Sequence, residues 1–211
     1  MTEQAYVDGT IAAYLSKLAS DEPEPGGGSV AALVGALGAG LVTMVASLTL
    51  GREKYAAVES DMSKINDTAE KLRAELGDLI TLDAVAYRKV ADAMKLPKDS
   101  EKQAAERTRV MQAALKGAAE TPLRVVEKAV EVARLSLPAA EMGNPQAVSD
   151  AGVAALLADA AAQSGALNVK INMAWINDEE FNKAIWARTE AALVEAAELR
   201  EEVLALTYSK L

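Results

Sequence analysis

An uncharged segment at residues 25–51 constrains this chain more than any other feature. It opens with a Pro-Gly-Gly-Gly-Ser turn and carries no charge until Arg52. The segment is long enough to cross a bilayer, but it is built from Gly and Ala rather than Leu and Phe. Small residues four apart on one helix face let a neighbouring backbone come close. Residues with this spacing are Gly28, Ala32, Ala36 and Gly40. The pattern favours a helix packed inside a bundle over a membrane helix.

The turn at the start of this helix is a candidate ligand-binding element. Consecutive glycines allow close approach of a ligand, and a helix N-terminus exposes unpaired amides. The turn is not a phosphate-binding P-loop, because no Gly-Lys-Ser/Thr follows it, and no strand precedes it as in a dinucleotide fingerprint. A tight linker that caps the helix is the alternative interpretation. The candidate binding residues are Gly26, Gly27, Gly28 and Ser29.

The other long segments are amphipathic and predict helices, and no strand pattern is present. Thr121-Pro122 is typical of a helix start, and Ser100 and Asn177 each open a capping-box sequence. We expect helices near residues 10–19, 59–96, 100–119, 121–143, 148–175 and 178–208 beside the apolar one. The sequence therefore predicts an all-α, single-domain bundle of about six helices over residues 1–211, with the small-residue helix buried at its centre.

Composition removes several classes of function. The formal net charge of -9 argues against nucleic acid and against anionic membrane surfaces. The chain has no Cys and no His, which excludes thiolate chemistry and removes the commonest general base and metal ligand. Acid–base chemistry would fall to Asp, Glu, Lys, Tyr or water. The N-terminus carries no basic stretch followed by an apolar core, so we expect no signal peptide and a cytoplasmic location.

Asp83 is the candidate proton carrier. A seam of apolar residues follows the helix at 59–96 in alternating steps of three and four, and Asp83 stands where the pattern calls for Leu. The seam contains Met62, Ile65, Ala69, Leu72, Leu76 and Leu79 before it, and Ala86 and Val90 after it. Burial raises the pKa of a carboxyl group towards neutrality, which suits proton transfer. A structural ion pair, or a seam that ends at this point, is the alternative.

Two further groups of polar residues are weaker candidates. Ser149 and Asp150 begin a helix, where both are good N-caps and either a capping or a ligand-binding role fits. Asn168 and Asn172 belong to a polar stripe on an otherwise apolar helix. Buried amides are usually satisfied by other helices, but they can equally read the polar edge of a heterocycle.

Lys95 and Lys98 follow the C-terminal end of the Asp83 helix. Cations at this place offset the helix dipole, which is the simpler interpretation. A substrate with carboxylate groups would also be attracted there.

Six segments are distributed along nearly the whole chain. They are 23–33 (Pro-Glu-Pro-Gly-Gly-Gly-Ser-Val-Ala-Ala-Leu), 50–55 (Leu-Gly-Arg-Glu-Lys-Tyr), Asp83 with Ala86 and Tyr87, 95–98 (Lys-Leu-Pro-Lys), 143–155 and 166–172. Together, and in this order, they resemble the formiminotransferase-cyclodeaminase C-terminal family, which includes small methenyltetrahydrofolate cyclohydrolases.

The resemblance implies a helical homodimer that binds a tetrahydrofolate derivative in a cleft at or near the subunit interface, with no metal and no cofactor beyond the folate substrate. It implies that Asp83 is the acid–base residue. The substrate-binding candidates that it implies, beside the glycine turn, are Lys54, Lys95, Lys98, Asn144, Ser149, Asp150, Asn168 and Asn172.

The expected reaction is that of formimidoyltetrahydrofolate cyclodeaminase, which converts 5-formiminotetrahydrofolate to 5,10-methenyltetrahydrofolate and ammonia. Methenyltetrahydrofolate cyclohydrolase is the alternative, because both reactions demand the same residues. Two alternatives of other classes are a non-catalytic helical dimer scaffold and a membrane helix hairpin.

Overall fold

The computed structural model describes residues 6–211, and within them six α-helices, three short 3-10 helices and no strand follow one another. The α-helices are α1 (Ile11–Leu18), α2 (Gly27–Ser47), α3 (Glu59–Met94), α4 (Glu101–Met142), α5 (Val148–Met173) and α6 (Glu179–Lys210), and the 3-10 helices are η1 (Tyr6–Asp8), η2 (Glu53–Val58) and η3 (Pro145–Ala147). The predicted all-α fold of about six helices is confirmed. The first five residues, which belong to the segment where we expect no signal peptide, lie outside the described residues. The single-domain interpretation stays a prediction.

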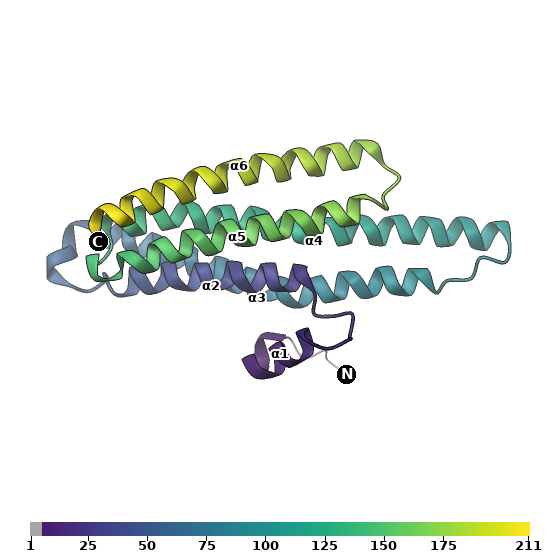
Figure 1. The fold of residues 1–211 in the computed structure, drawn as a ribbon, viewed down its shortest axis with the longest axis horizontal. Coiled ribbons are helices and arrows are strands. Elements are labelled where there is room, and N and C mark those ends of the chain that lie inside the picture. The colour runs from purple at the N-terminus through teal and green to yellow at the C-terminus, as the bar shows by residue number, and fades with distance from the viewer. Residues whose placement is uncertain (1–5) are drawn as a thin grey trace.

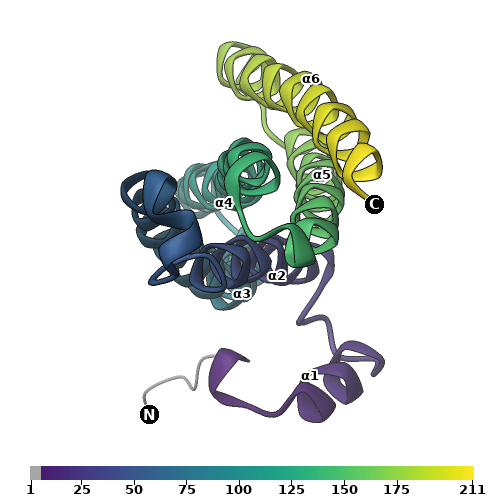
Figure 2. The same ribbon diagram turned by 90° about the vertical axis from the view of Figure 1, so that its left-hand side faces the viewer.

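Five long helices run lengthwise beside one another, and the short helix α1 lies apart from them (Figure 1). The end-on view in Figure 2 shows α2 among α3, α4 and α5, all of which contact it, whereas α6 packs outside against α4 and α5. The turn between α3 and α4 forms one end of the bundle. The α2–α3 and α4–α5 connections form the other end.

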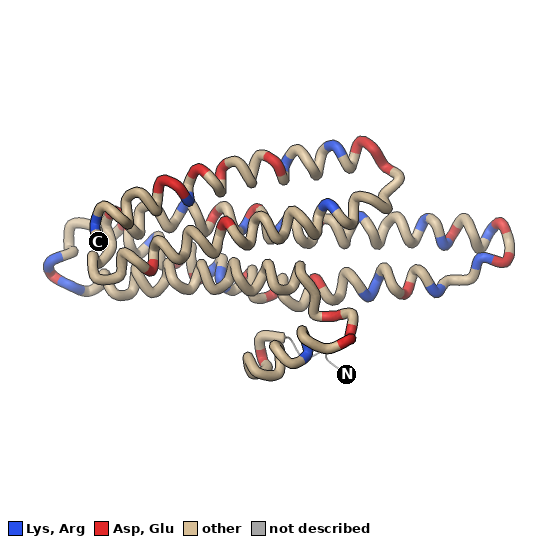
Figure 3. Tube along the Cα trace, viewed as in Figure 1, with Lys and Arg blue, Asp and Glu red and all other residues tan. Residues whose placement is uncertain are grey.

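Helix α2 is buried through its small residues, as the sequence predicts. A Cβ atom added at Gly38 would lie 3.2 Å from the Ala154 carbonyl oxygen, and one at Gly35 would lie 3.2 Å from a methyl group of Leu76. Glycine at these positions therefore lets α3 and α5 approach closely. Figure 3 shows α2 free of charged residues. Among the described helices it alone is long and apolar enough to cross a membrane by length and composition, and half of that stretch is buried inside the bundle.

The predicted boundary between two helices at Thr121-Pro122 is wrong, because α4 continues unbroken past Pro122. A proline inside a helix has no amide hydrogen for the carbonyl four residues earlier, which here is Ala118. The Asn172 side-chain amide of α5 donates to that carbonyl at 2.9 Å. A neighbouring helix therefore satisfies the group that the proline leaves unpaired, and the helix does not need to end.

The predicted capping residue of the last helix is also wrong. Asp178, rather than Asn177, caps α6, and its carboxylate accepts from the Phe181 amide at 2.9 Å. The Asn177 backbone amide donates instead to the Gln112 side chain of α4 at 2.7 Å. The capping box at Ser100 and Gln103 is confirmed.

Because α5 packs closely against α4, we expect one methyl group added at Gly165 to lower the stability of the fold. In Gly165→Ala, the new Cβ would lie 2.8 Å from a Val126 methyl group and 3.1 Å from the Pro122 carbonyl oxygen. We expect a loss of about 1–3 kcal/mol in the free energy of unfolding, measured by urea denaturation. Gly117→Ala is the matched control within α4, because nothing lies within 4 Å of its added Cβ. It should stabilise by about 0.5–1 kcal/mol, and equal effects of the two variants would contradict this packing argument.

Candidate active site

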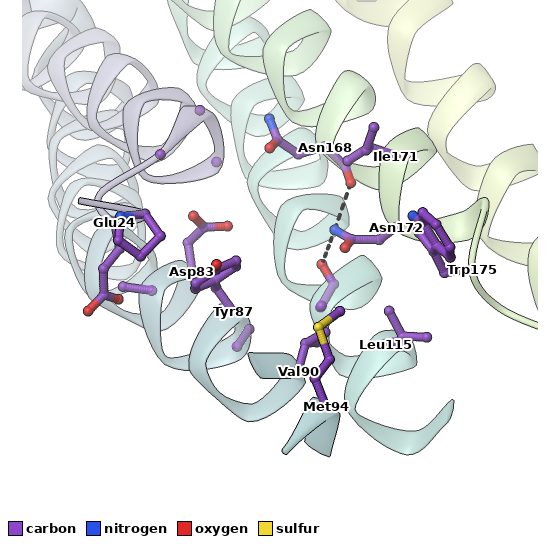
Figure 4. Close-up of a pocket in the computed structure, with 17 residues that line it drawn as sticks. Glu24, Asp83, Tyr87, Val90, Met94, Leu115, Asn168, Ile171, Asn172 and Trp175 are labelled. Atoms are coloured by element: carbon purple, nitrogen blue, oxygen red, sulfur yellow. Dashed lines mark hydrogen bonds between the residues drawn. The ribbon is translucent and has the colours of Figure 1, made fainter. Parts of the chain in front are cut away.

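A cavity of about 350 Å³ lies where the N-terminus of α2 meets α3, α4 and α5. In Figure 4, Asp83 stands on one side of it, and Asn168, Asn172 and Trp175 stand on the other. The predicted site residues that line this cavity are Gly26, Gly27, Gly28, Asp83, Asn168 and Asn172. Segments far apart in the sequence thus meet at one place.

The Asp83 carboxylate serves as the missing cap of α2. Gly26 occupies the N-cap position and makes no side-chain capping bond. One Asp83 oxygen, Oδ2, accepts from the Ser29 backbone amide at 3.0 Å. A Cβ atom at Gly28 would lie 2.1 Å from the other oxygen, Oδ1, so glycine is required for this approach. The glycine turn therefore binds a carboxylate of the protein itself, that of Asp83.

Opposing effects act on the pKa of Asp83. Burial raises this pKa above the ordinary aspartate value, and the hydrogen bond from the Ser29 amide lowers it. The Glu24 carboxylate, which lines the same cavity and pairs with Arg88 of α3, raises the pKa of Asp83 further. The balance is a carboxyl group with a raised pKa, as the sequence predicts for a buried acid in an apolar seam.

Ser29 supports Asp83 from behind and does not itself line the cavity. Its side chain is fully buried and shares a 3.0 Å hydrogen bond with the Tyr14 hydroxyl. Burial also raises the pKa of Tyr14. Tyr14 is the one buried residue of α1, so this contact fastens that helix to the back of the site.

The two asparagines line the cavity and donate their NH₂ groups to backbone carbonyls. The NH₂ group of Asn172 donates both to the Ala118 carbonyl and to the Asn168 carbonyl, each at 2.9 Å. The NH₂ group of Asn168 donates to the Ser164 carbonyl at 2.8 Å. Because Asn172 uses both of its N–H groups on the backbone, its oxygen is the atom left to accept from a ligand.

Four predicted site residues lie at the opposite end of α2. The Asn144 side chain accepts from the Tyr55 hydroxyl at 3.0 Å, and Lys54 lies over the ring of Tyr55 at 4.5 Å. Ser149 and Asp150 are in the first turn of α5, and Ala147 rather than either of them is its N-cap. From the 1.5 Å rise per residue of α2, this group is about 30 Å from Asp83 within one chain. The structure brings these residues together with one another but not with Asp83.

The two candidate lysines after α3 differ in their surroundings. Lys95 is exposed, pairs with Asp92 at 2.9 Å and does not line the cavity beside Asp83. Lys98 lines a second cavity that adjoins the first one.

Sequence reasoning did not identify three residues of the cavity wall as candidates. Tyr87 and Trp175 expose 45% and 69% of their surface, and Glu24 lies in the linker before the glycine turn. Tyr87 stands four residues after Asp83, one helical turn away on the same face, so the spacing could have marked it. Trp175 follows the end of α5 and carries no such periodic signal.

These features define an all-helical protein with a half-buried carboxylate, which lies at a helix N-terminus and lines a cavity between four helices. Within the described residues no group of three His, Cys, Asp or Glu side chains is placed to hold a metal ion. Residues 10–191 match the sequence profile of the formiminotransferase-cyclodeaminase family. The chain therefore belongs to this family.

Individual relatives agree with this assignment. A methenyltetrahydrofolate cyclohydrolase of Methylorubrum extorquens is 41% identical over 95% of this chain and 97% of its own length. Formimidoyltransferase-cyclodeaminase of Rattus norvegicus is 32% identical over 92% of this chain, which spans only 36% of that protein. The crystal structure of formiminotetrahydrofolate cyclodeaminase from Thermotoga maritima superimposes with a TM-score of 0.86 at 32% identity, over 95% of this chain and 96% of that one.

The raised pKa of Asp83 predicts a stability effect that is separate from catalysis. A carboxyl group with a raised pKa in the folded state contributes most stability below its unfolded pKa and loses this contribution as the pH rises through the folded value. Asp83→Asn removes the charge while keeping an acceptor for the Ser29 amide. We therefore expect this variant to be at least as stable as the wild type at about pH 7, with its advantage shrinking towards about pH 4. Thermal unfolding across this range checks it, and an advantage that grows in acid would contradict the assignment.

Proposed function

We propose that this protein is an enzyme of folate one-carbon metabolism and that it hydrolyses 5,10-methenyltetrahydrofolate to 10-formyltetrahydrofolate. The observation that carries the proposal is the Asp83 carboxylate, held in a cavity at the N-terminus of α2 with a raised pKa. The choice of hydrolysis is supported by the similarity to the Methylorubrum extorquens cyclohydrolase, which extends over nearly the full length of both chains.

Asp83 would act as base and then as acid on one bound water. As the water oxygen bonds to the methenyl carbon, Asp83 takes one water proton, and a neutral tetrahedral carbon forms between N5 and N10. Asp83 then returns that proton to N5 as the bond from the carbon to N5 breaks. The remaining hydroxyl proton leaves to solvent as the formyl carbonyl forms on N10. A carboxyl group with a pKa raised towards neutrality suits both steps.

The charge of the cavity fits a cationic substrate centre. The methenyl bridge carries a positive charge shared between two nitrogens, and it is drawn to carboxylates. Glu24 and Asp83 both line this cavity, and none of its described lining residues is Lys or Arg. The amide oxygens of Asn168 and Asn172 would accept from the N–H groups of the pterin ring.

Cyclodeamination is the second candidate reaction, and it is the reaction that the sequence resemblance led us to expect first. The Thermotoga maritima cyclodeaminase shares this fold at full length, which favours it. There N10 attacks the carbon of the protonated formimino group on N5, and Asp83 takes the N10 proton as the tetrahedral carbon forms. Asp83 then returns this proton to the amino nitrogen, which leaves as ammonia as the bond from the carbon to that nitrogen breaks and the methenyl cation forms. Both reactions pass through a tetrahedral carbon between two nitrogens.

A parallel assay of both reactions tests the proposal. We expect purified protein to consume 5,10-methenyltetrahydrofolate faster than the buffer does, followed by its absorbance. Asp83→Asn should lower kcat by about a hundredfold or more, because it removes the proton carrier. With 5-formiminotetrahydrofolate, released ammonia is measured in the same preparations.

Each outcome has a defined meaning. Ammonia release with slow hydrolysis would replace cyclohydrolase by cyclodeaminase. Near-full activity of a folded Asp83→Asn protein would remove the role of Asp83. No turnover and no thermal stabilisation by either folate would favour the scaffold alternative.

We further propose that the active form is a homodimer. Helices α2 and α5, which contact each other, leave apolar side chains exposed along their length. The exposed side chains are Leu37, Met44, Leu48, Val153, Leu156, Leu167 and Ile171. A second copy packed on this face in the opposite direction would place its Lys54, Asn144, Ser149 and Asp150 beside the Asp83 cavity. This arrangement accounts for site candidates that lie about 30 Å apart in one chain.

A charge placed at the centre of this face tests the dimer. Leu37 lies at the middle of α2 and exposes 54% of its surface. We expect Leu37→Arg to shift the protein to a monomer in light scattering and to abolish turnover together with dimerisation, because a desolvated unpaired charge opposes association. Val194→Arg on α6, where valine exposes 60%, is the control and should remain dimeric and active. A fully active monomer would contradict the shared site.

Several expectations remain predictions from the sequence. They are the absence of any metal, of a cofactor beyond the folate substrate and of a nucleic-acid or membrane partner, and the cytoplasmic location. Metal analysis of the active protein, and activity retained after treatment with a chelator, would test the first of them.

A further inference from the structure

A second cavity, of about 710 Å³, adjoins the one that holds Asp83. The two cavities share three wall residues, which are Met94 at the end of α3, Leu115 of α4 and Trp175 after α5. Figure 4 labels these three side chains at the edge of the first cavity away from Glu24. The second cavity continues from there towards the turn between α3 and α4, where Lys98 lies.

The two cavities have opposite charge. Glu24 and Asp83 are the charged residues among the described lining of the first cavity. Lys98 and Arg107 are the charged residues among the described lining of the second. A chain with a net charge of -9 has thus placed two cations and no carboxylate in the wall of one cavity. A ligand that spans both would carry positive charge at one end and negative charge at the other.

We infer that the second cavity is the binding site for the aminobenzoyl-glutamate end of the substrate, with Trp175 stacked on the benzoyl ring and Lys98 paired with a glutamate carboxylate. This inference rests on the proposed function, since it takes the methenyl carbon to lie beside Asp83. A methenyltetrahydrofolate then runs from the acidic cavity, past the apolar neck of Met94, Leu115 and Trp175, into the basic cavity.

The backbone of Trp175 is fixed although its indole is exposed. The Gln112 side chain of α4 donates to the Trp175 carbonyl at 3.0 Å and accepts from the Asn177 amide at 2.7 Å. One glutamine therefore holds both sides of the loop that carries the indole. An exposed aromatic ring on a fixed loop between two cavities is suited to stacking on a flat ligand group, at little entropic cost.

The two cations differ in their contacts with the rest of the chain. Arg107 donates to the Met94 carbonyl at 2.9 Å, which ties the guanidinium to the end of α3. Lys98 lies in the turn between α3 and α4 and is exposed. Arg107 would provide a fixed positive charge, and Lys98 is the residue to remove without disturbing the turn.

Tryptophan fluorescence tests the stacking directly, because the chain has only two tryptophans. The second, Trp186, lies under Lys170 at 4.0 Å and lines neither cavity. Trp186→Phe leaves Trp175 as the only reporter, and Trp175→Phe leaves Trp186. With p-aminobenzoyl-L-glutamate as the probe, we expect saturable quenching in the first variant and none in the second. Equal quenching in both, or no saturable quenching in either, would overturn the inference.

A charge comparison tests the carboxylate contact. The wild type should bind p-aminobenzoyl-L-glutamate about fivefold more tightly than p-aminobenzoate, and Lys98→Gln should abolish this preference. Lys102→Gln is the matched control, since Lys102 is an exposed lysine of the first turn of α4 that lines neither cavity, and it should keep the preference. For the methenyl substrate, Lys98→Gln should raise KM about fivefold with kcat unchanged, because the contact is the same before and during reaction. An unchanged preference in Lys98→Gln would overturn the contact.

These fragments separate failure of the inference from failure of the proposed function. They contain neither the pterin nor the methenyl carbon, so their binding does not depend on turnover. Fragment binding at Trp175 and Lys98 in a protein that converts no folate would leave the subsite standing and remove the proposed reaction. Folate turnover without fragment binding, and with KM unaffected by Lys98→Gln, would leave the reaction standing and remove the subsite.

Discussion

Both the start of helix α2 and the proposed reaction depend on the hydrogen bond from the Ser29 amide to the Asp83 carboxylate. Helix α2 begins at glycines and has no side-chain cap of its own, so its first amides need an acceptor from elsewhere. Asp83 supplies it from α3, and Gly28 provides the space. The same contact that completes the central helix therefore fixes the position of the proposed proton carrier. Burial raises the pKa of Asp83 while the helix amide lowers it, which keeps the carboxyl group able to change its protonation state.

The opposite wall of the site depends on one backbone hydrogen bond that is missing inside the continuous helix α4. Pro122 leaves the Ala118 carbonyl without its helical partner, and Asn172 donates to that carbonyl. Gly165 on the same face of α5 lets the two helices meet closely enough for this bond, since any side chain there would strike Val126. A proline that could have ended the helix instead orients an asparagine, whose remaining oxygen is the polar group available to a ligand. The same hydrogen bond therefore pairs the freed carbonyl and orients a residue of the proposed binding site.

The sequence is informative about elements and much less so about which ends of them meet. Periodicity alone marked Asp83, because a carboxylate in a seam of Leu and Ile is visible without a structure. It also marked α2 as a buried helix, from its small residues. The prediction at Pro122 was wrong because a helix start and a tolerated internal proline look alike in sequence until the partner of the freed carbonyl is known. Likewise, nothing local distinguishes Asn144, which lies at the far end of α2, from Asn168, which lines the cavity.

Under the proposed chemistry, the two candidate reactions differ mainly in their treatment of water. A cyclohydrolase must admit water to the methenyl carbon, whereas a cyclodeaminase must keep water from hydrolysing its own product. Asp83 serves either purpose, so it does not select between them. In the single chain, Tyr87 and Met94 of the cavity wall expose 45% and 58% of their surface, which leaves this side of the site open to solvent. Access of water to the methenyl carbon therefore depends on how much of this wall the proposed second copy leaves open. The selection between the reactions lies in the surface around Asp83 rather than in the carboxylate itself.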